Sequence, residues 1–233
     1  MKITSAIIIA LASAAKAHYT FPGFIHDGLT EEDWTYVRKT TNFGRTDHGP
    51  VYNVSDPQLR CYELKPGSNG AGIMSVKAGD EVGFRVDGTV THPGPLQFYM
   101  AKAPEGETAE TFNGDGDVWF KIFHDDATWR TGEWWPSWSN YGRDNVTVTI
   151  PPCLAEGDYL LRVEHIAIHN AAHENGAQFY IGCAQLHVSG EGTKSFPGVS
   201  IPGLYSATDP GILFDYQGSA TSYVTPGPEV ISC

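Results

Sequence analysis

The chain has 233 residues, enough for one domain with a sizeable core, and 41% of them are hydrophobic. Its 27 Asp and Glu residues outnumber its 15 Lys and Arg residues, which gives a formal charge of −12. This balance excludes nucleic acid and anionic lipid as partners, because both require basic clusters. The 26 glycines and 15 prolines indicate many turns.

Residues 1–17 (MKITSAIIIALASAAKA) have the pattern of a secretory signal peptide. Lys2 precedes a short apolar run, residues 5–11, and residues 15–17 (AKA) form a small-x-small cleavage site. The apolar run is too short to span a bilayer, which takes about 20 residues. We therefore predict a secreted chain that begins at His18 and, having lost two lysines, carries a formal charge of −14.

An N-terminal histidine brings two nitrogen donors together on one residue. Its α-amine has a pKa of about 7.7 to 8, so it deprotonates readily beside the imidazole. The amine and ring Nδ1 then close a chelate ring on one metal ion. Copper prefers square or T-shaped nitrogen sets, so His18 is a candidate copper ligand.

Four cysteines in a secreted chain indicate two disulfides, for which three pairings are possible. Residues 53–55 (NVS) and 145–147 (NVT) are N-glycosylation sequons with acceptors Asn53 and Asn145. Such short motifs often arise by chance, but a secretory route favours their use.

The mature chain reads as a succession of short strands. Residues 26–50 are polar and have no clear period, so we expect a long loop there. Most of the strand-like segments carry apolar residues at alternate positions, and no helical period persists. These segments are residues 18–25, 73–76, 81–86, 96–101, 118–123, 146–150, 159–168 and 178–188. The pattern predicts a single domain, residues 18–233, with an antiparallel β-sandwich fold.

The tail, residues 190–233, is rich in Gly and Pro but keeps six large apolar side chains. A solvated linker rarely carries so many. We therefore expect the tail to wrap the sandwich, held in place by Cys233.

Two groups of histidines stand out among the nine in the chain. His92 lies in residues 91–95 (THPGP), where the prolines stiffen the turn and fix the direction of the ring. Residues 164–169 (EHIAIH) place His165 and His169 on one face of a strand, and residues 178–180 (QFY) do the same for Gln178 and Tyr180. Without further context, an ordinary loop histidine and a satisfied core hydrogen-bond network are the more common explanations of these groups.

Other chemistries have weaker support. His165 and His169 have the spacing of a helical zinc pair, but the alternation indicates a strand and HExxH is absent. Residues 113–117 (NGDGD) resemble a calcium loop, but His124 stands where an EF-hand has Glu. The chain has no GxSxG nucleophile elbow. Asp125, Asp126 and Glu133 are candidates for a carboxylate-pair glycosidase.

Taken together, the motifs resemble those of the fungal lytic polysaccharide monooxygenases of auxiliary activity family nine, formerly glycoside hydrolase family sixty-one. The resemblance runs from His18 to the end of the chain. Its motifs are residues 18–21 (HYTF), 92–95 (HPGP), 99–104 (YMAKAP), 159–162 (YLLR), 164–169 (EHIAIH) and 176–183 (GAQFYIGC). A last motif spans residues 197–212 and contains residues 197–198 (PG), Tyr205 and residues 209–212 (DPGI). Each motif is modest alone, but their order with an N-terminal histidine is specific.

The resemblance implies a role for each site residue. His18 would bind copper through its amine and Nδ1, and His92 through Nε2, in a histidine brace. Tyr180 would occupy the axial position. Gln178 and His169 would hydrogen-bond the oxygen species beside the metal, in keeping with the general need for groups that orient reactive ligands.

The resemblance also implies an immunoglobulin-like β-sandwich and a Cys61–Cys183 disulfide, which leaves Cys153–Cys233 as the second pair. The implied reaction is the copper-dependent oxidative cleavage of cellulose or another insoluble β-1,4-glucan by a secreted monomer. The reaction would use one copper ion per chain, an external electron donor and hydrogen peroxide or oxygen. It would hydroxylate the glucan at C1, C4 or both.

Among surface aromatic residues, Tyr205 matches a family tyrosine that stacks on sugar rings, and Tyr19 is a further candidate; Trp34 and Tyr36 have weaker support. The chain has Ile168 where the family often has Leu, and residues 31–43 match no family motif. Two alternatives remain open from the sequence. One is a hydrolytic glycosidase on the same scaffold, and the other is a non-catalytic copper- or glucan-binding protein with the same brace.

Overall fold

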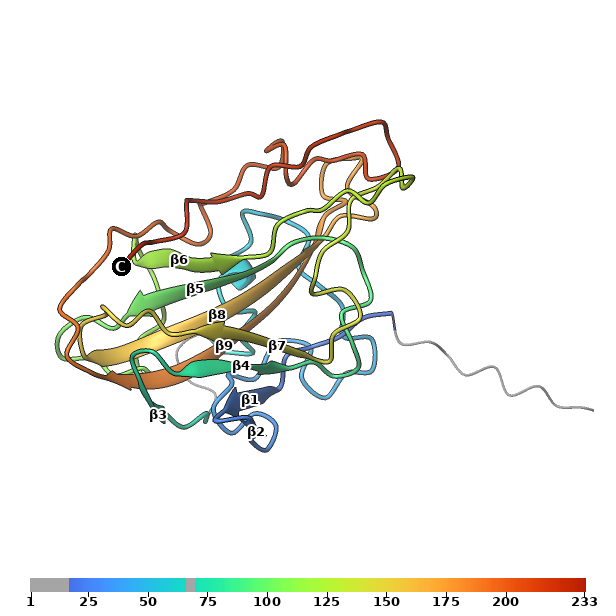
Figure 1. Ribbon diagram of the computed structural model, residues 1–233. Helices are drawn as coiled ribbons and strands as arrows, with labels where there is room; N and C mark the ends of the chain where they lie inside the picture. The colour runs from blue at the N-terminus through green and yellow to red at the C-terminus, as the bar shows by residue number, and fades with distance from the viewer. Residues whose placement is uncertain (1–16, 66–69) are drawn as a thin grey trace, which may run out of the picture.

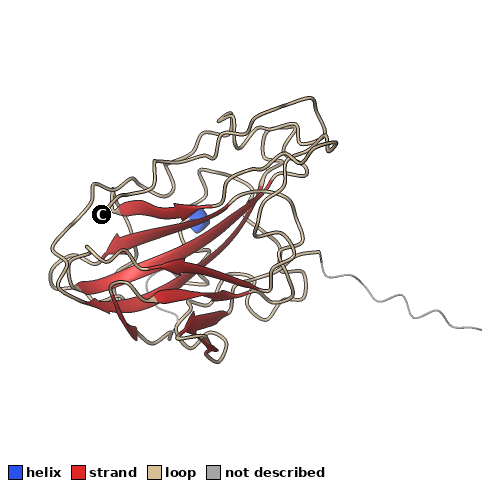
Figure 2. Cartoon of the chain, in the orientation of Figure 1, coloured by secondary structure: helices blue, strands red, loops and turns tan. Residues whose placement is uncertain are grey.

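The structure is a computed structural model that describes residues 17–65 and 70–233. The predicted signal peptide, apart from Ala17, lies outside the described residues. Within them, nine strands form two sheets, and the only helical element is a short 3-10 turn, Pro57–Leu59 (Figure 2). None of the described helices is long and apolar enough to cross a membrane. The predicted all-β fold is confirmed.

The two sheets pack against each other as the layers of a sandwich (Figure 1). The smaller sheet is antiparallel and has the order β2-β1-β4-β7, with β1 (Gly23–His26), β2 (Leu29–Thr30), β4 (Glu81–Arg85) and β7 (Asn145–Thr149). The larger sheet has the order β3-β9-β8-β5-β6, with β3 (Met74–Lys77), β5 (Leu96–Lys102), β6 (Trp119–His124), β8 (Gly157–Ala167) and β9 (Gln178–Ser189). Only its β3–β9 pair is parallel.

The predicted strands agree with the observed ones to within two residues, except at the start of the mature chain. There the first strand begins at Gly23 and not at residue 18, and β2 lies within the predicted loop. Asp27 and Gly28 both have positive φ, 51° and 71°, and they close a tight hairpin between β1 and β2. An Asp-Gly pair is a strong hairpin signal, so this strand could have been predicted.

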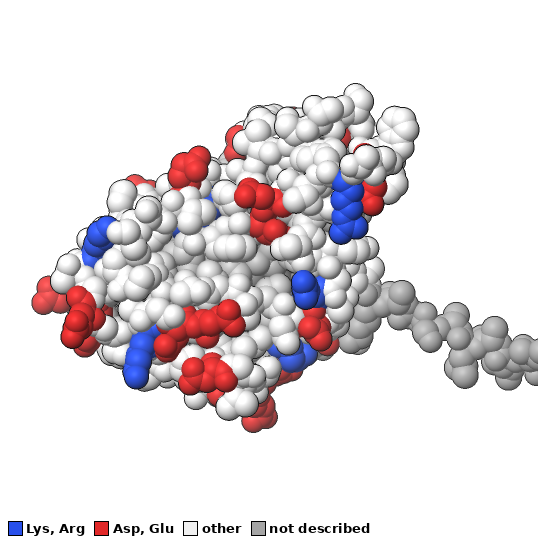
Figure 3. Space-filling model, in the orientation of Figure 1, with Lys and Arg blue, Asp and Glu red and all other residues white. Residues whose placement is uncertain are grey.

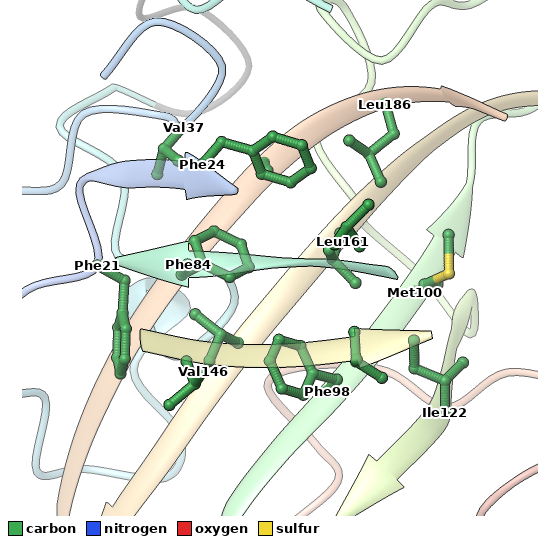
Figure 4. Packing of buried hydrophobic residues seen from close by; sticks show 14 of the residues in the cluster. Phe21, Phe24, Val37, Phe84, Phe98, Met100, Ile122, Val146, Leu161 and Leu186 are labelled. Atoms are coloured by element: carbon green, nitrogen blue, oxygen red, sulfur yellow. The ribbon is translucent and has the colours of Figure 1, made fainter. Parts of the chain in front are cut away.

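The main core lies between the two sheets. Phe84 and Val146 come from the smaller sheet and pack with Phe98, Met100 and Leu161 of the larger one (Figure 4). Their strand neighbours point the other way because successive side chains alternate across a strand. Burial of these side chains stabilises the sandwich by about 1.5 to 3 kcal/mol each.

The outer face of the larger sheet is also buried, under loops and the tail. Tyr99, Trp119 and Ile181 point to this face and pack with Tyr205 and Ile212 of the tail. The central strands β8 and β9 are therefore buried on both faces for most of their length. The tail wraps the sandwich as predicted, which Figure 1 shows as the orange-to-red segment above the sheets.

Two disulfides anchor loops to this framework. Cys61–Cys183 joins the segment after the 3-10 turn to β9, and Cys153–Cys233 joins the end of the tail to the segment after β7. They close loops of 122 and 80 residues. In the chain-entropy account, loops of that size stabilise the fold by about 4 to 5 kcal/mol each.

Candidate metal centre

His18, His92 and Tyr180 meet at the end of the sandwich where β9 begins. The ring centroid of His18 lies 6.3 Å from that of His92 and 6.1 Å from that of Tyr180, and the His92 and Tyr180 centroids are 5.9 Å apart. His18 belongs to the segment before β1, His92 to the 91–95 loop and Tyr180 to β9. Both histidines are half-buried, whereas Tyr180 is buried.

His169 and Gln178 join the same cluster. The His169 ring stacks on the ring of His92, with centroids 4.1 Å apart and an angle of 20° between the planes. The Tyr180 hydroxyl donates to Oε1 of Gln178 at 2.9 Å. Strand register explains the second pair, since Gln178 and Tyr180 share one face of β9. The structure thus brings together all five residues singled out from the sequence.

The loop that carries His92 is fixed against β8. The Pro93 carbonyl accepts from the amide of Ile168 at 2.9 Å, and the Pro95 carbonyl accepts from that of Ile166 at 3.0 Å. Between them, Gly94 has a φ of +147°, and a Cβ there would lie 1.8 Å from the Ile166 carbonyl oxygen. Glycine is therefore required at this position, and the close approach sets the place of the His92 ring.

The protonation state of His92 suits a metal ligand. Burial, then the neighbouring His169 and His18, lowers the pKa of His92 to about 4. The ring is therefore neutral at ordinary pH and keeps a lone pair for a metal ion. Its Nε2 is buried without a hydrogen-bond partner among the described residues, and so is Nδ1 of His169. A buried nitrogen without a partner is costly, so these atoms fit a ligand-binding role.

These donors fit copper better than a carboxylate-bound or zinc-type site. Neutral imidazoles with a free amine form the nitrogen set that copper prefers. Across the described residues, no three His, Cys, Asp or Glu side chains are grouped to hold a metal. In the unprocessed chain the backbone nitrogen of His18 is part of the peptide bond with Ala17. The Ala17 carbonyl accepts a hydrogen bond from Thr91 Oγ1 at 2.9 Å.

His165 lies beneath the cluster and holds it together. Its Nε2 is 3.2 Å from the Gly94 carbonyl, which can only accept, so Nε2 carries the proton. Nδ1 then accepts from the Tyr19 hydroxyl at 2.6 Å. Burial is the main cause that lowers the pKa of His165 to about 3, so the ring stays neutral in this position.

Asp125 and Asn140 extend this network to the next loop. Asn140 donates through Nδ2 to the Gly94 carbonyl at 3.0 Å and to Asp125 at 2.8 Å. Asp125 also accepts from the hydroxyl of Ser139. Since it is buried and fully engaged, Asp125 supports the loop and is not one of a pair of glycosidase carboxylates; Asp126 is exposed beside His124.

The structure does not support a calcium-binding loop at residues 113–117. Asp115 lies 2.6 Å from the Arg60 guanidinium, and the Asn113 side chain accepts from the amide of Asp115 at 2.9 Å. Both groups are therefore used to hold a turn against Arg60.

The predicted substrate contacts of Tyr205 and Tyr19 are wrong, because both rings are buried. Tyr205 is 6% exposed, and its hydroxyl donates to Glu164 at 2.6 Å. Tyr19 is 2% exposed and stacks on Tyr180, with centroids 4.2 Å apart. Neither ring can offer a face to a sugar. Trp34 and Tyr36 are partly buried and pack against the main core.

Comparison with known proteins agrees with the fold and the site. The sequence model of Auxiliary Activity family 9 (formerly GH61) matches residues 18–223. The chain is 51% identical over 236 residues to AA9 family lytic polysaccharide monooxygenase A of Thermothielavioides terrestris, covering all of both chains. It is 52% identical over 234 residues to monooxygenase H of the same family from Malbranchea cinnamomea, covering 99% of each.

Solved structures give the same result. The extended catalytic domain of LPMO9A from H. jecorina superposes with a TM-score of 0.80 at 30% identity, covering 92% of this chain and 91% of that one. A cellulose-active polysaccharide monooxygenase from M. thermophila superposes with a TM-score of 0.77 at 27% identity, covering 92% and 99%.

The family model and the relatives place this β-sandwich among the monooxygenases that act on polysaccharides. This chain belongs to auxiliary activity family 9. It is therefore a lytic polysaccharide monooxygenase, an oxidoreductase of a copper-dependent family that cleaves polysaccharides oxidatively with the help of an external reductant.

Proposed function

We propose that cleavage after Ala17 exposes His18, and that the mature chain binds one copper ion. The His18 amine and Nδ1 and the His92 Nε2 would be its nitrogen ligands. The observation that carries this proposal is the meeting of the two imidazoles beside Tyr180, with Nε2 of His92 buried and unsatisfied among the described residues.

Tyr180 would lie beside the metal as a neutral phenol. Burial raises the pKa of its hydroxyl well above the ordinary value, so a strong phenolate bond to a metal is disfavoured. The hydroxyl is also occupied, since it donates to Gln178. Tyr180 would therefore border the metal without binding it tightly.

Gln178 and His169 would handle the oxygen species. The Tyr180 hydroxyl binds Oε1 of Gln178, which leaves the amide N–H groups of Gln178 as donors. His169 stacks on His92, and burial lowers the pKa of His169, so its neutral ring has one nitrogen to donate and one to accept. Together they can orient a small oxygen ligand and hold or transfer a proton beside it.

Bound copper would supply one-electron redox chemistry and the activation of hydrogen peroxide, or of oxygen with further electrons. We propose that the outcome is hydroxylation of a β-1,4-glucan at C1, C4 or both, after which the hydroxylated carbon expels the neighbouring sugar. The description of the M. thermophila relative as cellulose-active supports cellulose as one substrate.

We further propose that the protein acts outside the cell as a monomer. Two disulfides fit an oxidising compartment, and the sequon residues Asn53 and Asn145 are both exposed. Acidic side chains are scattered over the face shown in Figure 3, where no cluster of Lys and Arg appears. Such a surface suits a neutral polysaccharide and opposes nucleic acid binding.

The test uses mature protein with a verified His18 N-terminus, loaded with one copper ion. It is incubated with cellulose, ascorbate and a little hydrogen peroxide, and products are identified by mass spectrometry. Aldonic acids or C4-ketosugars that disappear in His18→Ala, but persist in the distant control His187→Ala, are expected. Their absence on cellulose and on soluble β-glucans, despite bound copper, would favour a non-catalytic copper- or glucan-binding protein.

A further inference from the structure

Strand β7 is held on one side only. It is the last strand in the order β2-β1-β4-β7, so β4 is its single strand partner in the described part of the chain. The Ile150 amide donates to the Asp80 carbonyl at 2.9 Å, toward β4. Bonded pairs alternate along an antiparallel ladder, so Val146 and Val148 also bond to β4, and the residues between them direct their backbone groups away from it. Such a strand opens locally more readily than a central one.

The same strand begins with an N-glycosylation sequon. Its first three residues, Asn145, Val146 and Thr147, have the order Asn-x-Thr. Asn145 and Thr147 are exposed, whereas Val146 is buried in the main core. The alternation of side chains across the strand therefore puts the acceptor amide and the sequon hydroxyl on the solvent side, where a glycan can be accommodated.

A hollow of about 260 Å³ opens beside this sequon. Asn145 and Thr147 themselves contribute to its lining, so a sugar attached to Asn145 begins at the hollow. Polar and apolar side chains share the rest of the lining: Leu96, Phe123, Asp125, Asn140 and Arg143. The hollow is below the usual range of ligand-binding clefts, so it suits one sugar unit and not a chain of several.

Asn140 gives this lining an unused hydrogen-bond acceptor. Its Nδ2 donates to the Gly94 carbonyl at 3.0 Å and to Asp125 at 2.8 Å. Because the Gly94 carbonyl can only accept, the orientation of the amide is fixed. Oδ1 of Asn140 is buried and has no hydrogen-bond partner among the described residues. An unsatisfied buried acceptor is costly, so a donor seated in the hollow would lower that cost.

N-acetylglucosamine, the first sugar of an N-glycan, carries the groups that this lining can bind. Its hydroxyls and acetamido N–H are donors for Asn140 and Asp125, and its acetyl carbonyl is an acceptor for the Arg143 guanidinium. Its acetyl methyl group and C–H face can pack against Phe123, which is partly buried. The hollow therefore offers a partner to each kind of group on this sugar.

We propose that Asn145 carries an N-glycan whose first N-acetylglucosamine occupies this hollow and covers the outer side of β7. In the secretory pathway, the amide nitrogen of Asn145 bonds to C1 of the first sugar of a lipid-diphosphate-linked oligosaccharide. The bond between C1 and the diphosphate breaks, the lipid diphosphate leaves, and the amide nitrogen gives up one proton without a change of oxidation state. The inference goes beyond the proposed function, since it concerns the fold and needs no metal.

The test uses protein secreted by a fungal host and follows hydrogen exchange of the β7 amides by mass spectrometry. Wild-type protein is measured before and after an endoglycosidase that leaves only the first sugar, and both forms should exchange alike. Thr147→Val removes the sequon hydroxyl but keeps a β-branched side chain suited to a strand. In this variant the amides of Val146 and Val148 should exchange about tenfold faster. Thr147→Ser keeps the sequon and should behave as the wild type does.

Ser55→Ala is the control for a glycan elsewhere on the chain. It removes the other sequon, whose Asn53 accepts from the Ser55 amide, and it should leave β7 exchange unchanged. Peptide mapping that finds Asn145 unmodified in the secreted wild-type protein would overturn the inference. Equal exchange in the trimmed wild type and Thr147→Val would also overturn it, because the first sugar would then give β7 no protection.

Discussion

The hydroxyl of Tyr19 lies 2.6 Å from Nδ1 of His165, and through that ring it is linked to the Gly94 carbonyl, 3.2 Å from Nε2. Tyr19 directly follows His18, and Gly94 is two residues after His92. One buried imidazole thus connects the two chain segments that carry the proposed metal ligands. The separation of those ligands is therefore set inside the protein, before any metal binds.

Tyr19→Phe should destabilise the protein by about 1 to 3 kcal/mol, because it leaves Nδ1 of the buried His165 without a donor. Urea unfolding of the metal-free protein measures the change. Tyr52→Phe removes a hydroxyl from an exposed ring and should cost less than about 0.5 kcal/mol. Equal stability of the wild type and Tyr19→Phe would show that the hydrogen bond contributes nothing net.

Metal-free protein should lose stability as the pH falls below about 6.5. Burial lowers the pKa of His165 to about 3 in the folded state, against about 6.5 in the unfolded chain. The unfolded state therefore binds more protons between these values, so stability is full above pH 6.5 and is lost progressively toward pH 3. The loss attributable to His165 between pH 7 and pH 4 is about 3 kcal/mol.

Denaturant unfolding at several pH values tests this expectation. His165→Gln can both donate to Gly94 and accept from Tyr19, yet it does not titrate, so it should flatten the pH dependence. His187→Ala changes a histidine on β9 that is not part of this network and should keep the wild-type slope. A slope that His165→Gln leaves unchanged would assign the acid sensitivity to other groups.

Gly94→Ala should be strongly destabilising, by at least about 3 kcal/mol, since a Cβ would overlap the Ile166 carbonyl oxygen. Thermal melting gives the readout, and copper calorimetry should show weaker binding as the His92 ring is displaced. Gly88→Ala is a matched control: it also has positive φ but an open environment, so it should cost only about 1 to 2 kcal/mol. Similar costs for the two changes would contradict the close-packing argument.

Protein that retains Ala17 should bind copper at least about 100-fold more weakly than protein that begins at His18, because a peptide nitrogen replaces the amine. Calorimetry with copper(II) at fixed pH compares the two chains. A chain extended by one alanine after Cys233 controls for added length and should bind like the mature form. Tight binding that survives the Ala17 extension would exclude the amine as a ligand.

Much of the fold could be predicted because strand alternation records which side chains face the core. The segments now seen as β4, β5 and β9 were found for this reason. The two-residue strand β2 was missed because it has too few positions to show a period, although its Asp-Gly turn was a usable signal.

The site was predictable to a different degree. His18, His92 and Tyr180 were found from motif order, and strand parity placed Gln178 beside Tyr180. The exposure of aromatic residues was not predictable, since burial depends on which loops cover the sheet. Tyr205 was expected at the surface, but it packs with the tail against the outer face of the larger sheet, whereas Trp134 and Trp135 stand exposed on a loop with no period to mark them.

The tail has a consequence for how the protein behaves at high concentration. Strand β6 is the outermost strand of the larger sheet, and tail residues Val199 and Ile231 bond to its free backbone groups at Trp119 and Lys121. An uncovered strand edge is a template for pairing with another chain. Because Cys153–Cys233 holds the end of the tail in place, we expect loss of this disulfide to promote aggregation through β6 as well as unfolding.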